Sequence, residues 1–139
     1  MRISLALVLL ALVCGSRARR YGRCELASIL VRNGIPRSRI PDWICMATAE
    51  SSLNSKAIHK NKDGSTDYGI FQINSAYWCS PGKLNMCNVP CSALRSDDIA
   101  PSIQCAKKIY RKRGFNAWVG WKHKCKGKDL SSYVKGCHY

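Results

Sequence analysis

The sequence predicts an α+β fold in which a small antiparallel sheet lies between two groups of helices. Apolar residues recur at helical spacing near both ends of the 139-residue chain, and a stretch between them combines β-forming residues with the turn dipeptide Asp63-Gly64. Nine cysteines further indicate a fold held by disulfides. Because helices and strands are segregated along the chain, we expect two lobes with a cleft between them.

The first 18 residues have the pattern of a secretory signal peptide. Arg2 precedes an apolar run from Ile3 to Cys14 that is too short to span a bilayer, and Ser16 and Ala18 suit signal peptidase. We therefore expect residues 1–18 to be removed. Residues 19–139 should form a single secreted, extracellular domain without a membrane anchor, and we expect it to be a monomer.

Two helices are expected before the sheet. Within residues 24–34 apolar side chains recur every three or four positions, and Gly34 is placed to end the helix. The second helix should begin at Ile40-Pro41-Asp42, because proline suits the first turn and an aspartate suits the positive end of the helix dipole. It should continue through Leu53.

The sheet and an irregular loop follow. Asp63-Gly64 predicts a two-residue hairpin turn between short strands. Residues 75–90 are rich in Ser, Pro, Gly, Asn and Cys, which predicts a loop held by disulfides rather than by a core.

Helical spacing returns at Ser96. A third helix is expected over residues 96–114, with Ser96 or Asp97 as its cap and cationic side chains near its end. A short fourth helix should follow over residues 116–125, with Asn116 as its cap.

Eight cysteines remain once Cys14 has left with the signal peptide, and an even number in a secreted chain indicates disulfides. Eight cysteines allow about 105 connectivities, so the pattern alone leaves the pairing open. A zinc site is not expected, because Cys87 and Cys91 are the only closely spaced pair and the three histidines are scattered.

The chain is strongly basic. Without Arg2 and Arg17 it carries 21 basic and 8 acidic side chains, a formal charge of +13. Polyanions are therefore the expected partners, and nucleic acid, heparin-like chains, acidic lipid and the bacterial wall all fit. A solvated basic surface that only keeps the protein soluble is the alternative.

Glu50 places a carboxylate on an apolar helical face. Trp43, Met46, Ala47 and Leu53 lie three to seven residues away and share this face. Desolvation disfavours the charged form, so the pKa of Glu50 should be raised, as a general acid requires. The alternative is a glutamate at a helix end that reaches solvent or pairs with a lysine.

Asp67 follows the hairpin turn in a polar setting, between Ser65, Thr66 and Tyr68, and should stay ionised. One protonated and one charged carboxyl group together provide what glycoside hydrolysis needs, since one protonates the leaving oxygen and the other stabilises or attacks the anomeric carbon. The alternative for Asp67 is a role in supporting the turn.

Several stretches closely resemble the c-type lysozymes, and they extend over essentially the whole chain after residue 18. The order and rough spacing of the eight cysteines also agree with this family. The resemblance implies a lysozyme-like fold with a helical lobe, a small β lobe and a cleft. The matching stretches are RCELA at 23–27, AESSLN at 49–54, GSTDYGIFQINSAYWC at 64–79, CAKKI at 105–109 and NAWVGWKHKCKG at 116–127.

The resemblance also implies residue roles. Glu50 would be the general acid and Asp67 the nucleophile or stabiliser of a retaining β-1,4-glycosidase that needs no cofactor, with Trp118 as the apolar wall against Glu50. Substrate would contact Asn61, Gln72, Asn74, Tyr77, Trp78, Ala117 and Trp118, with Asn61 and Asn74 also supporting Asp67. The family's disulfides would be Cys24-Cys137, Cys45-Cys125, Cys79-Cys91 and Cys87-Cys105.

The chain departs from the family pattern in three places. The segment between Cys79 and Cys87 is shorter than in typical vertebrate members. Residues 111–113 are Arg-Lys-Arg where many members place an aspartate at the far edge of the cleft, so binding of chitin fragments should be weaker. Only Asp97 and Asp98 are acidic where calcium-binding relatives hold their ion, so no metal is expected.

The leading hypothesis is a secreted, bacteriolytic muramidase that cleaves peptidoglycan between N-acetylmuramic acid and N-acetylglucosamine, drawn to the anionic bacterial surface by its charge. No specific nucleic-acid partner is expected. Two alternatives are a non-enzymatic cationic antimicrobial protein, supported by the basic run at residues 107–113, and a carbohydrate-binding protein without turnover.

Overall fold

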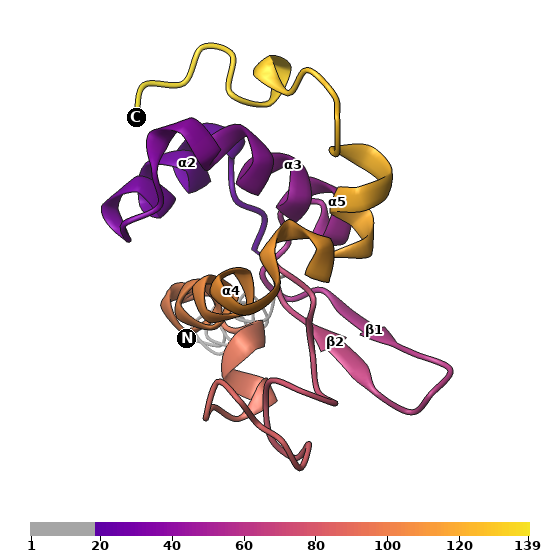
Figure 1. The fold of residues 1–139 in the computed structure, drawn as a ribbon. Coiled ribbons are helices and arrows are strands. Elements are labelled where there is room, and N and C mark those ends of the chain that lie inside the picture. Colours follow the sequence, from indigo (N-terminus) through magenta and orange to yellow (C-terminus); the bar gives the residue numbers. More distant parts are fainter. Residues whose placement is uncertain (1–18) are drawn as a thin grey trace, which may run out of the picture.

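The computed structural model describes residues 19–139, so the expected signal peptide lies outside the described residues. A helical lobe and a separate three-stranded antiparallel sheet make up the fold, as predicted, and Figure 1 shows the strands projecting from the helices. The helices are α2 (Arg23–Arg32), α3 (Ile40–Ser51), α4 (Ala100–Arg113) and α5 (Val119–Lys124), and the strands are β1 (Ile58–Lys60), β2 (Thr66–Tyr68) and β3 (Ile73–Asn74).

The ends of α2 and α3 follow from local sequence. α2 stops before Gly34, whose φ of +88° is a left-handed conformation that glycine tolerates best. α3 begins with proline in its first turn, as expected, but it ends at Ser51 because Ser52 and Leu53 both adopt positive φ. The prediction that the helix continues through Leu53 is therefore wrong.

The hairpin between β1 and β2 is longer than predicted. The last strand pair is Lys60 with Thr66, and beyond it the Asn61 N–H donates to the Ser65 carbonyl oxygen at 2.8 Å. The prediction of a two-residue turn at Asp63-Gly64 is therefore wrong. Gly64 closes the turn at a φ of +90°. The side chain of Asp63 accepts hydrogen bonds from the backbone and hydroxyl of Ser65 and thereby stabilises the longer connection.

The predicted caps of the last two helices are also wrong. α4 begins at Ala100, three residues after the later candidate, and the carboxylate of Asp98 accepts the Ala100 N–H at 3.0 Å. Asn116 belongs to a 3₁₀ turn over Gly114–Ala117 that precedes α5.

Trp43 on α3 is the centre of an aromatic core. Its ring lies 5.8 Å from Phe71, 5.7 Å from Tyr110, 5.5 Å from Phe115 and 5.9 Å from Trp118, measured between centroids. These rings come from α4, from the turn before α5 and from the segment between β2 and β3. Their packing fixes the sheet and α5 against the helix that carries Glu50.

Four disulfides cross-link the chain. They join Cys24 to Cys137, Cys45 to Cys125, Cys79 to Cys91 and Cys87 to Cys105, the pairs that the family resemblance implied. The segment from 75 to 90, all of it within the described residues, has no helix or strand, and the last two disulfides hold it. Among residues 19–139, no helix has both the length and the apolar character needed to cross a bilayer.

Candidate active site

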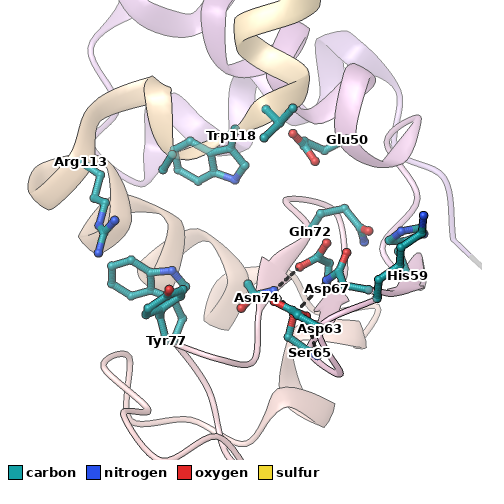
Figure 2. A pocket seen from close by; sticks show the side chains of 15 residues that line it. Glu50, His59, Asp63, Ser65, Asp67, Gln72, Asn74, Tyr77, Arg113 and Trp118 are labelled. Carbon is teal, nitrogen blue, oxygen red and sulfur yellow. Dashed lines mark hydrogen bonds between the residues drawn. The ribbon is translucent and has the colours of Figure 1, made fainter.

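A cleft of about 620 Å³ lies between the helices and the sheet. It brings together all nine side chains to which the sequence assigned catalytic or substrate contacts, and Figure 2 shows it from close by. Those nine lining residues are Glu50, Asn61, Asp67, Gln72, Asn74, Tyr77, Trp78, Ala117 and Trp118.

Glu50 enters the cleft from the last turn of α3. Its side chain is half-buried, and burial raises its pKa above the ordinary value. The negative charge of Asp67 raises the pKa further, whereas a hydrogen bond donated by the Gly120 N–H to Oε2 at 2.8 Å works in the opposite direction. Since the net shift is upward, desolvation prevails over the hydrogen bond, and the carboxyl group holds its proton more tightly than a free glutamate does.

The alternative for Glu50, a glutamate at a helix end that reaches solvent or pairs with a lysine, holds only in part. Glu50 does lie in the last turn of α3 and is only half-buried, but no lysine among residues 19–139 pairs with it. The ion pairs found among residues 19–139 are Arg19 with Glu25 and Lys56 with Asp97. Neither involves Glu50. Three of the apolar neighbours expected on its face, Trp43, Met46 and Ala47, are buried.

Asp67 is the middle residue of β2, the central strand of the sheet. The Asn74 side-chain amide donates one hydrogen bond to Oδ1 of Asp67 and another to the Ser65 hydroxyl, both at 2.8 Å. Register explains the contact, because Asn74 on β3 is the partner of Asp67 across the strand pair. An amide donor suits a carboxylate that acts as an acceptor and fixes its orientation.

Asn61 supports the site less directly than expected. Its amide donates to the Ser65 hydroxyl at 3.1 Å, so its hydrogen bond stabilises the hairpin rather than Asp67. Gln72 is also committed to the backbone: its amide donates to the carbonyls of Gly69 at 2.9 Å and Ala57 at 3.2 Å. For Gln72 this leaves the side-chain oxygen available as an acceptor for a ligand.

The cleft tryptophans are held firmly. Trp118 is 4% exposed and donates its indole N–H to the Phe71 carbonyl at 2.9 Å, and in Figure 2 its ring lies on the same wall as Glu50. Trp78 is also buried, whereas Tyr77 is 46% exposed and presents its ring to solvent. A wall of aromatic faces suits the C–H surfaces of sugars.

Sequence reasoning missed several residues of the cleft. His59 and Lys62 line it from the hairpin. Arg113, one of the three basic residues expected at the far edge of the cleft, does line it from the end of α4, whereas Arg111 and Lys112 do not. The contact made by Gly120 comes from the backbone, so no side-chain signal could reveal it. Register could have suggested His59, because it pairs with Asp67 across β1 and β2. Within residues 19–139, no cluster of three or more His, Cys, Asp or Glu is arranged to hold a metal ion.

Comparison with known proteins agrees with this geometry. The model of the C-type lysozyme/alpha-lactalbumin family matches residues 19–137. The chain belongs to this family. It is 50% identical to lysozyme c-1 of Anopheles gambiae over 134 residues, which cover 94% of this chain and 95% of the relative. It is 49% identical to lysozyme C-1 of Mus musculus over 146 residues, covering 99% of each. Relatives of this likeness, both named lysozymes, support a lysozyme-family glycosidase.

Proposed function

We propose that the protein is a secreted muramidase that hydrolyses the β-1,4 bond between N-acetylmuramic acid and N-acetylglucosamine in peptidoglycan. The observation that carries this proposal is the pairing of Glu50, whose pKa burial raises, with Asp67 across one cleft. Family membership and the two named lysozymes support the reaction class.

In the proposed reaction Glu50 donates its proton to the glycosidic oxygen as the bond from that oxygen to the anomeric carbon breaks. The ionised carboxylate of Asp67, oriented by Asn74, stabilises the developing positive charge or bonds to the anomeric carbon. Glu50, now ionised, takes a proton from the water that attacks this carbon, and any bond between Asp67 and the carbon breaks as the new C–O bond forms. Glycosyl transfer to water with retention then leaves both carboxyl groups as they began, and no cofactor is consumed.

The positive charge has a separate role in this proposal. Peptidoglycan and the polymers around it are anionic, so a net charge of +13 on residues 19–139 raises the local concentration of enzyme at the bacterial surface. Export by the expected signal peptide would bring the chain to that surface as a monomer. Salt should screen this attraction and slow attack on whole cells, while hydrolysis of a short neutral oligosaccharide should change little.

Clearing of a bacterial cell-wall suspension by Glu50→Gln tests the proposal. Glutamine preserves the size and can accept the Gly120 hydrogen bond but cannot act as the acid, so the rate should fall at least about 100-fold. Glu25→Gln is the matched control, since Glu25 is paired with Arg19 on the surface away from the cleft.

Three outcomes would distinguish the hypotheses. Loss of clearing in Glu50→Gln but not in Glu25→Gln supports the muramidase. Equal clearing by all three proteins would contradict it and assign the activity to charge alone. Cell-wall binding without any clearing by the wild type would contradict it in favour of a carbohydrate-binding protein.

A further inference from the structure

The positively charged side chain of Arg113 lies at one end of the cleft. Arg113 is the last residue of α4, and its guanidinium carbon lies 5.6 Å from the ring centroid of Tyr77, which belongs to the segment after β3. Figure 2 shows the two side chains together at the end of the cleft away from His59. The pair joins the helical lobe to the β lobe across this end, and both side chains line the cleft.

The guanidinium of Arg113 has its hydrogen-bond donors free. Neither ion pair found in residues 19–139 involves Arg113, and within the same residues its side chain forms no hydrogen bond. An arginine presents five N–H donors in a planar fork that fits a carboxylate, and the pairing is often bidentate. The Tyr77 ring favours a guanidinium placed over it, although this attraction is weak at an exposed site. Arg113 thus lies beside the Tyr77 ring without being neutralised.

We infer that Arg113 binds a carboxylate of the substrate on a sugar that occupies this end of the cleft. The inference rests on the proposed function and narrows its substrate class to acidic glycans. Muramic acid carries such a carboxylate on its lactyl group or on the peptide attached there, whereas a chain of N-acetylglucosamine carries none. Arg113 therefore favours peptidoglycan over neutral chitin-like chains by a local contact, in addition to the general attraction of the basic surface.

The neighbouring basic residues allow the local contact of Arg113 to be distinguished from the general attraction of the basic surface. Arg111 and Lys112 are exposed on the same turn of α4, yet neither lines the cleft. Arg111 instead borders a different cavity, with Trp43 and Tyr110. Arg111→Gln consequently removes the same charge as Arg113→Gln without touching the cleft.

The test compares kcat/KM on two forms of one glycan at fixed ionic strength. The first is a peptide-free peptidoglycan strand with free lactyl carboxylates, and the second is the same strand with those groups converted to amides. The wild type should prefer the acidic strand by about tenfold, the scale of one charged hydrogen-bonded pair. Arg113→Gln should lose this preference, Arg111→Gln should keep it, and Arg113→Lys should fall between because it retains charge without the fork.

A strand that still carries its peptides identifies the source of the carboxylate. Preference on the peptide-free strand assigns it to the lactyl group, and preference only on the peptide-bearing strand assigns it to the peptide. Preference retained by Arg113→Gln, or lost equally by Arg111→Gln, would overturn the inference. Binding to the same strands is measured in parallel, so a protein that never hydrolyses them but binds the acidic strand through Arg113 would refute the muramidase and leave the carboxylate site standing.

Discussion

The Gly120 N–H donates a hydrogen bond to Oε2 of Glu50 at 2.8 Å and so joins the end of α3 to the first turn of α5. This bond favours the ionised carboxylate, whereas burial and the charge of Asp67 favour the protonated form. The upward shift in the pKa of Glu50 is therefore a balance, and each contribution can be changed separately.

Removal of the Asp67 charge should lower the pKa of Glu50. Asp67→Asn keeps the shape of the side chain but eliminates the Coulomb repulsion that disfavours ionisation of Glu50. NMR titration of the Glu50 carboxyl group measures the change directly. An unchanged pKa would mean that the two carboxyl groups do not interact across the cleft.

The raised pKa of Glu50 should also be visible in the pH dependence of the free energy of unfolding. Burial raises the pKa of Glu50 in the folded state, so its contribution to the free energy of unfolding is complete below the unfolded pKa and is lost as pH rises through the folded pKa. Glu50→Gln has no such titration. Urea unfolding with intact disulfides at about pH 4 and about pH 7 should show the variant gaining stability relative to the wild type at the higher pH. A constant or opposite difference would contradict the direction of the shift.

Asn74 should matter more to turnover than Asn61. Asn74→Ala removes the amide that orients Asp67, whereas Asn61→Ala removes only a hydrogen bond to the Ser65 hydroxyl. Loss of one hydrogen bond to a charged group corresponds to about a tenfold fall in kcat, and the Asn61 variant should lose less. Kinetics on a soluble oligosaccharide separate kcat from KM. Equal losses in the two variants would show that Asn74 does not act through Asp67.

Substitution of Gly69 tests the close packing of the β lobe against the backbone of Leu94. A Cβ atom at this position would lie 1.8 Å from the Leu94 carbonyl oxygen, on a backbone with φ of +78°. Gly64 has a similar φ of +90° but open space around it, so Gly64→Ala isolates the backbone strain. We expect Gly64→Ala to cost about 1 kcal/mol of unfolding free energy and Gly69→Ala about 3 kcal/mol or more. Denaturant unfolding compares them, and similar losses would argue against the close contact.

Local sequence signals predicted the elements better than their limits. Gly34 and the proline in the first turn of α3 have strong conformational preferences, and the corresponding boundaries were predicted well. At the start of α4, Ser96, Asp97 and Asp98 are all plausible caps. The helix begins at Ala100, which places Pro101 in its first turn, so the proline was a better guide to this boundary than the capping residue types.

The chemistry of the cleft was more predictable than its geometry. Residue type and apolar surroundings indicated a raised pKa for Glu50, and the structure agrees in direction. The approach of Arg113 to Tyr77 depends on how α4 meets the loop after β3, which is a relationship between distant segments. The backbone contact from Gly120 could not be predicted from its donor, because every residue except proline carries the same N–H. The one sequence feature that bears on it is the glycine itself, since a Cβ atom there would lie 2.7 Å from Oε2 of Glu50.

The proposed mechanism requires Glu50 to carry a proton at the pH where the protein acts and to deliver it to the substrate. The pKa of Glu50 from NMR, compared with the pH at which kcat/KM on a neutral oligosaccharide declines on the alkaline side, tests this most directly. The two values should coincide and lie above 4.5, the ordinary value for a glutamate. A Glu50 pKa at or below that value, or a rate that stays constant as Glu50 ionises, would contradict it.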